Sequence, residues 1–160
     1  MIRDLLLEQH TACYDEDNWF VAVKNAVAGL TAEQAAWKRD GADNTIWEEV
    51  NHIIFWNERW VQRYRGMLTY PEDIENTGTF LSSETDWKTT CKKLYSVMDE
   101  WREILHEITD EKLASPVNDK YQEPWFKPLA QQNIHNAYHI GQIVLLRKLQ
   151  GSWDSSKGVS

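Results

Sequence analysis

Four segments of the chain repeat apolar residues at the three- and four-residue intervals of an amphipathic helix. The pattern predicts helices over residues 2–29, 46–65, 83–108 and 129–149. The third segment is the most regular, with Trp87, Cys91, Leu94, Met98, Trp101, Leu105 and Ile108 in alternating steps of four and three. Because no segment alternates as a strand does, we expect an all-α chain in which these stripes face a common core.

Capping patterns indicate where two of the helices begin. Thr31 and Gln34 form one capping-box pattern, which predicts a short turn of helix, and Thr45 and Glu48 form another at the start of the second long helix. Gly29 follows the first apolar stripe and is a plausible end for that helix. Residues 38–44 are polar and rich in turn formers, which predicts a loop.

The connections differ in character. Residues 68–81 contain Pro71, Gly78 and several acids, which predicts a surface connection long enough to cross over the bundle. Residues 110–128 hold three prolines among aromatic residues such as Trp125; this composition is too irregular for a helix, and we expect the segment to border a pocket. We therefore expect one four-helix bundle domain over residues 1–151, followed by a polar tail over residues 152–160.

Composition and charge exclude several classes of function. The 160 residues suit a single domain, and 25 acidic against 17 basic residues give a net charge of −8, which disfavours binding to nucleic acid. We find no apolar run long enough to span a membrane and no leader pattern at the first residues, so we expect a cytoplasmic protein. Cys13 and Cys91 lack metal-binding spacing and fall on apolar stripes, which predicts reduced core residues.

Histidines carry the candidate chemistry. His135 and His139 are four residues apart in a predicted helix, so they project from one face and can bind one ion. Spacing of this kind also occurs by chance and is weak evidence alone. The same stripe continues through Gln142, Leu146 and Leu149, which predicts that both imidazoles point into the bundle. The alternative is a pair of core histidines that find hydrogen-bond partners.

A third ligand is expected from a neighbouring helix. His52 is the best placed candidate, because it lies at the edge of the apolar arc of the second long helix. His10 and His106 fit less well, and His106 shares its stripe with charged residues. Glu48 and Glu49 could orient the His52 imidazole or accept a proton, but they could equally serve as acids that favour the first turn of a helix.

Three imidazoles would leave a coordination position open on a divalent ion, as in catalytic sites. Such an ion can acidify a bound water or thiol, or polarise a carbonyl. Imidazole suits zinc, nickel, copper and iron, and we expect zinc or nickel. His135 and His139 lack the intervening glutamate of the HExxH motif, so the metalloprotease mechanism has no built-in base here.

The same residues resemble the DinB-like (YfiT-like) superfamily. The landmarks that carry the resemblance are Gly29–Gln34, Thr45–Trp47, Asn51–Trp56 and His135–Gln142, and the last is the most specific. The resemblance implies an up-down-down-up bundle, a metal held by His52, His135 and His139, and often a homodimer.

Characterised relatives of this superfamily include thiol S-transferases that use bacillithiol or mycothiol, and a thiol-dependent isomerase. The resemblance therefore implies a divalent metal, a low-molecular-weight thiol cosubstrate and an electrophilic small-molecule substrate. Two other functions remain open from the residues. One is metal-assisted hydrolysis of an ester or amide, and the other is a non-catalytic metal-binding dimer of a stress response.

Overall fold

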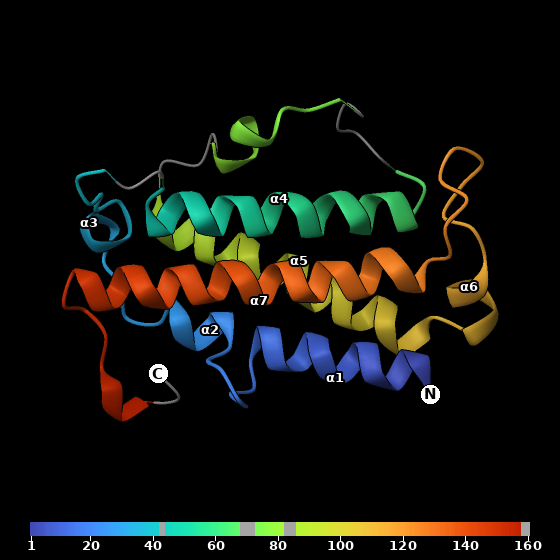
Figure 1. Cartoon of the computed structure of the whole chain (residues 1–160), viewed down its shortest axis with the longest axis horizontal. Helices are drawn as coiled ribbons and strands as arrows, with labels where there is room; N and C mark the ends of the chain where they lie inside the picture. Colours follow the sequence, from blue (N-terminus) through green and yellow to red (C-terminus); the bar gives the residue numbers. More distant parts are fainter. Residues whose placement is uncertain (42–43, 68–72, 82–85, 158–160) are drawn as a thin grey trace.

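Four long helices form the body of the molecule in a computed structural model that describes residues 1–41, 44–67, 73–81 and 86–157 (Figure 1). They are α1 (Ile2–Tyr14), α4 (Ile46–Tyr64), α5 (Trp87–Glu107) and α7 (Phe126–Leu149). Shorter elements lie between and after them: α2 (Val23–Ala26), α3 (Ala32–Ala35), the 3₁₀ helix η1 (Asn76–Phe80), α6 (Asp110–Ala114) and the 3₁₀ helix η2 (Ser155–Lys157). The expectation of an all-α fold is confirmed for the described residues.

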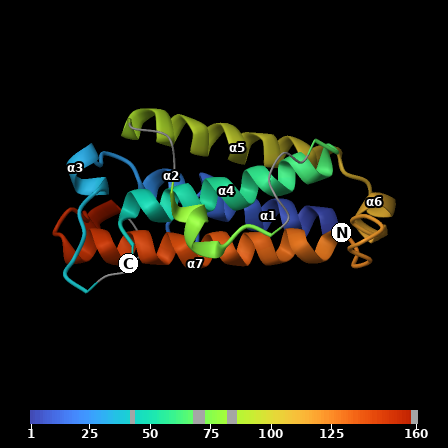
Figure 2. The same cartoon turned by 90° about the horizontal axis from the view of Figure 1, so that it is seen from above.

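The long helices run in an up-down-down-up order. In two views at right angles, α1 and α7 run in one direction and α4 and α5 in the other (Figures 1 and 2). Helices α1 and α4 each contact both α5 and α7, so every long helix has two neighbours in the bundle. Because α4 and α5 are parallel, the chain between them must return along the bundle, and η1 lies against α4 on this path (Figure 1).

The prediction of one continuous helix over residues 2–29 is wrong. Helix α1 ends at Tyr14, and α2 begins only at Val23. Asp15 and Asp17 explain the break, because short acidic side chains bond to nearby backbone groups and disfavour a helix interior. The Asp17 Oδ1 atom accepts a hydrogen bond of 2.9 Å from the Ala22 backbone N–H, directly before α2.

The predicted capping boxes are present. Thr31 and Gln34 bond reciprocally at the start of α3, and Thr45 and Glu48 do so at the start of α4. Thr45 N–H donates to Glu48 Oε2 over 2.7 Å. The predicted start of the third long helix at residue 83 lies outside the described residues, and α5 begins at Trp87 after an Asp86 cap.

Residues 110–128 are more ordered than their prolines suggest. The short helix α6 begins after Thr109, whose side chain accepts a hydrogen bond from Lys112 N–H, so the expectation of no helix in this segment is wrong. Pro116 and Pro124 then form an isolated antiparallel bridge. Helix α7 begins at Phe126, earlier than predicted, because Pro128 falls in its first turn, where no N–H is needed.

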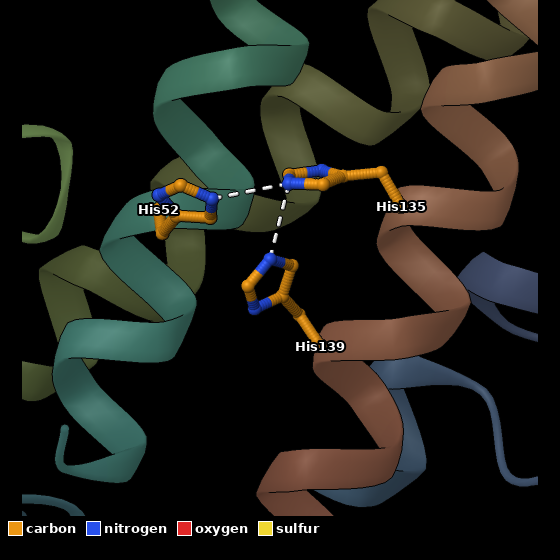
Figure 3. Close-up of side chains that lie close together, drawn as sticks. All are labelled: His52, His135 and His139. Atoms are coloured by element: carbon orange, nitrogen blue, oxygen red, sulfur yellow. Dashed lines mark hydrogen bonds between the residues drawn. The ribbon is translucent and has the colours of Figure 1, made fainter. Parts of the chain in front are cut away.

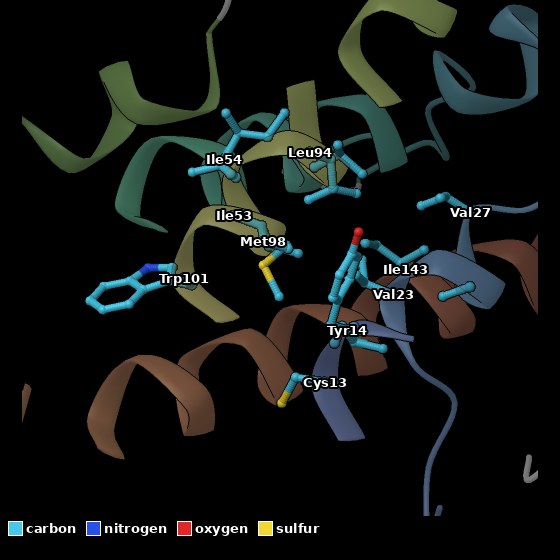
Figure 4. Close-up of a cluster of buried hydrophobic side chains, with 14 of the residues drawn as sticks. Cys13, Tyr14, Val23, Val27, Ile53, Ile54, Leu94, Met98, Trp101 and Ile143 are labelled. Carbon is cyan, nitrogen blue, oxygen red and sulfur yellow. The ribbon is translucent and has the colours of Figure 1, made fainter. Parts of the chain in front are cut away.

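The hydrophobic core lies between the long helices, and Figure 4 shows part of it. Its fully buried members include Ile53, Leu94, Met98 and Ile143. Both cysteines are free, Cys13 within this core and Cys91 half-buried beside it, as predicted. Among the described helices, none is both long and apolar enough to cross a membrane.

Candidate metal centre

The three predicted histidines meet between α4 and α7. His52 approaches from α4, while His135 and His139 approach from successive turns of α7 (Figure 3). The His135 Nε2 atom lies 3.1 Å from His52 Nε2 and 3.0 Å from His139 Nε2. These three side chains form a group that can hold a metal ion.

The 3₁₀ helix η1 fixes the orientation of His52. Thr79 Oγ1 donates to the Asn76 carbonyl over 2.6 Å, so its oxygen is left to accept from His52 Nδ1–H, 2.5 Å away. The Phe80 ring stacks on the imidazole with centroids 4.1 Å apart. Because its proton is on Nδ1, His52 presents the lone pair of Nε2 to the other two histidines.

Glu49 likewise fixes the orientation of His139. Its Oε2 atom lies 2.6 Å from His139 Nδ1, and its Oε1 atom accepts a hydrogen bond of 3.0 Å from the Asn44 side chain. The carboxylate is 1% exposed, so the interaction is shielded from water. Like His52, His139 therefore carries its proton on Nδ1 and directs a lone pair towards His135.

The three Nε2 atoms have too few protons to form a hydrogen bond at both of their contacts. Only His135 can place a proton on Nε2, and it can donate that proton well to one neighbour at a time. The other neighbour then has a lone pair about 3 Å from His135 Nε2 with no well-aligned donor, and a cation bound by all three Nε2 atoms would remove this mismatch once His135 carries its proton on Nδ1.

Burial keeps two of the three imidazoles uncharged near neutral pH. Burial lowers the pKa of His52 to about 3, with a further lowering from the neighbouring His139 and His135. Burial and the neighbouring His139 likewise lower the pKa of His135 to about 4. Both imidazoles are therefore neutral at pH 7, the form that binds metal.

A cavity of about 520 Å³ opens beside the histidines. Its lining residues are Asn44, Glu49, His52, Asn76, Phe80, His135, Tyr138, His139, Gln142, Leu145 and Leu146. The predicted stripe through Gln142 and Leu146 borders this cavity; Leu146 also packs against the core, whereas Leu149 at the end of the stripe is exposed. The core-facing residues of α7 are neighbours of the stripe, such as Ile140 and Ile143.

Two carboxylates were candidates for orienting His52, and neither contacts it in this way. Glu48 closes the capping box at Thr45, which was the structural alternative. Glu49 contacts His139 across the bundle. The two positions are still related, because Glu49 and His52 are three residues apart on one face of α4 and both point towards α7.

The remaining histidines lie elsewhere, as expected. His10 is buried in the core, where its Nε2 atom lies 3.0 Å from the Met98 carbonyl, and His106 is exposed. Trp125 does not line the cavity at the histidines. It is buried edge-on against Trp60 and Tyr64. The wall expected from residues 110–128 is supplied at this cavity by η1.

A comparison with protein families matches residues 17–143 to the DinB superfamily. The chain belongs to the DinB superfamily. The matched residues contain all three histidines, together with Glu49 and Thr79, so this superfamily assignment covers the whole candidate centre. None of the curated proteins matches the chain.

Proposed function

We propose that this DinB-superfamily protein is an enzyme that depends on a divalent metal, zinc or nickel, held by His52, His135 and His139. The observation that carries the proposal is the convergence of three Nε2 atoms, two of which have their lone pairs directed inward by Thr79 and Glu49. A divalent ion there would act as a Lewis acid that lowers the pKa of a bound water or thiol.

We further propose that the reaction is thiol S-transfer to an electrophilic small molecule. Among the described lining residues Glu49 is the only carboxylate, and both of its oxygen atoms are already bonded. The cavity therefore supplies no free general base, and a thiol, whose pKa is about 8.5, needs less assistance than water. With an alkyl halide, the thiol sulfur bonds to the electrophilic carbon, the thiol proton passes to solvent, and the halide departs with its bonding electron pair. With an activated alkene, the sulfur bonds to one carbon, the π electrons and a proton from solvent form a C–H bond at the other, and no group leaves.

The test is consumption of bacillithiol by metal-loaded protein against a panel of alkyl halides and activated alkenes. We expect thiol and electrophile to disappear in equal amounts, and His139→Ala to abolish the reaction. His106→Ala is the matched control, because this exposed histidine lies outside the centre. Absence of turnover with every electrophile would contradict the transferase assignment while leaving metal binding to be judged by itself.

Metal-assisted hydrolysis is the second candidate. The cavity beside the histidines favours hydrolysis, because the cavity has room for a water molecule and an ester or amide. Hydrolysis differs in one measurable respect, because turnover would not require thiol. Ester hydrolysis that persists without any thiol and disappears in His139→Ala would favour this reaction over S-transfer.

We also propose a homodimer. Large apolar side chains are exposed on α7 at Ile134, Tyr138 and Leu145, and the last two also line the cavity beside the histidines. An exposed apolar row of this kind marks contact surfaces in soluble proteins. Light scattering after size exclusion should give about twice the mass of the 18.8 kDa chain, and Ile134→Glu should shift it to the monomer. A monomeric wild type would contradict the proposal.

A further inference from the structure

A second cavity adjoins the candidate metal centre. It has a volume of about 270 Å³ and lies between the later turns of α4 and the first turns of α7. Its lining residues are Trp56, Trp60, Asn76, Pro128, Gln131, Gln132 and His135. His135 and Asn76 also line the first cavity, so the two spaces meet at one of the three histidines.

Two indole rings dominate the second cavity and are held in place by their neighbours. Trp56 and Trp60 are one helical turn apart, and the Trp56 ring lies edge-on to His135 with centroids 6.5 Å apart. The Arg63 guanidinium lies over the Trp60 ring at 4.6 Å, and the Trp125 ring meets Trp60 edge-on at 6.2 Å. A surface that is already rigid loses little conformational entropy when a ligand binds.

The described walls of the two cavities provide no positive charge. The second cavity is lined by aromatic rings, proline, amides and one imidazole, and the only charged residue at the first is Glu49. A carboxylate or phosphate in the second cavity would lose hydration without gaining a charged partner from the residues that line it. A ligand with an uncharged apolar end in the second cavity and a polar end at the three histidines matches the chemistry of both spaces.

We propose that the second cavity is a subsite for a flat, uncharged ring of the substrate, whose reactive polar end lies at the three histidines. The inference rests on the proposed metal-dependent function and adds the substrate class. A cavity of about 150 Å³ is enough to bind benzene, so a volume of about 270 Å³ admits one ring or two fused rings. The aromatic walls favour a planar group, because such rings pack face to face or edge to face.

Two hydroxamates that differ only in the ring provide the test on zinc-loaded protein. Acetohydroxamate carries a methyl group on the metal-binding hydroxamate, and benzohydroxamate carries a phenyl ring in place of that methyl. Isothermal titration should give a dissociation constant about tenfold lower or more for benzohydroxamate, because the ring is removed from water. Equal affinities would overturn the subsite even though the metal centre itself would be supported.

Variants locate the gain in affinity. Trp60→Ala should remove it, and Gln131→Trp should remove it by filling the space from an exposed position of α7 without loss of a core contact. Acetohydroxamate affinity should stay unchanged in both. Trp19→Ala is the matched control, since Trp19 is 89% exposed and lines neither cavity. A gain retained in both Trp60→Ala and Gln131→Trp would contradict the assignment.

A measurement without metal separates the two proposals. Benzyl alcohol added to metal-free protein should shift the indole N–H resonances of Trp56 and Trp60 in nitrogen–proton NMR spectra, and leave that of Trp19 unchanged. These shifts would support the subsite whether or not the metal centre exists. Failure of both hydroxamates to bind to zinc-treated protein would refute only the metal centre. The subsite would be overturned if benzyl alcohol shifted neither the Trp56 nor the Trp60 resonance, or if a subunit contact already covered these two indoles.

Discussion

Individual residues differ in how far the sequence predicts their place at the metal centre. His135 and His139 follow from spacing, because a helix puts positions four apart on one face. Its position at the edge of an apolar arc made His52 the best candidate for the third ligand, and the superfamily resemblance then fixed that choice. Thr79 could not be predicted, because it contacts His52 only after the chain between α4 and α5 has crossed over α4.

The Glu49 carboxylate should strengthen metal binding through His139. Replacing it in Glu49→Gln keeps an oxygen acceptor but removes the negative charge, and we expect metal affinity to fall about tenfold. Competition with a chromogenic chelator measures the change. Glu48→Gln is the matched control, because Glu48 only caps α4, and its metal affinity should equal that of wild type. Equal losses in the two variants would contradict the role assigned to Glu49.

Thr79 should strengthen metal binding by holding the orientation of His52. Thr79→Val preserves the shape of the buried side chain but removes the oxygen that accepts from His52 Nδ1–H. We expect metal affinity to fall about tenfold or more. Thr77→Val changes an exposed threonine of the same 3₁₀ helix and should leave affinity unaltered. If Thr79→Val bound metal as tightly as Thr77→Val, the hydrogen bond would not position the ligand.

At the scale of elements, capping residues predicted helix ends better than apolar spacing did. The boxes at Thr31 and Thr45 begin α3 and α4 as expected. Apolar spacing carried the first predicted helix through residues 15–22, where the structure has no helix. Val21 and Ala22 are buried in a non-helical segment, and burial alone produces apolar positions that resemble a helical stripe.

His10 of α1 is buried against the Met98 carbonyl of α5, and this contact should make the metal-free protein sensitive to acid. Burial lowers the pKa of His10 to about 4, from the ordinary histidine value of 6.5. Between these pH values the unfolded state binds more protons than the folded state, so the free energy of unfolding falls as pH falls. The loss attributable to His10 is on the order of 3 kcal/mol between pH 6.5 and pH 4.

Urea unfolding across this pH range measures the effect of His10. In His10→Gln the dependence should be flatter, because glutamine can donate to the Met98 carbonyl but does not titrate. His106→Gln should follow the wild-type curve, since His106 is exposed. Parallel curves for His10→Gln and wild type would show that His10 does not cause the acid sensitivity.

At the scale of the whole molecule, the order of the helices creates the centre. Because α4 and α5 are parallel, the chain between them crosses the bundle and brings η1 against α4, beside His52 (Figure 1). Apolar periodicity predicted the four helices but permitted several orders, and the superfamily resemblance supplied the up-down-down-up order. Local patterns cannot encode this order, because it depends on contacts between residues distant in the sequence.

Metal content is the most direct test of the central claim. Elemental analysis of protein purified without chelator should find about one divalent ion per chain in wild type and in the exposed-histidine control His106→Ala. His52→Ala and His139→Ala should each lose most of that metal, since each removes one of three ligands. Metal content that stayed at the wild-type level in both His52→Ala and His139→Ala would contradict the proposed site.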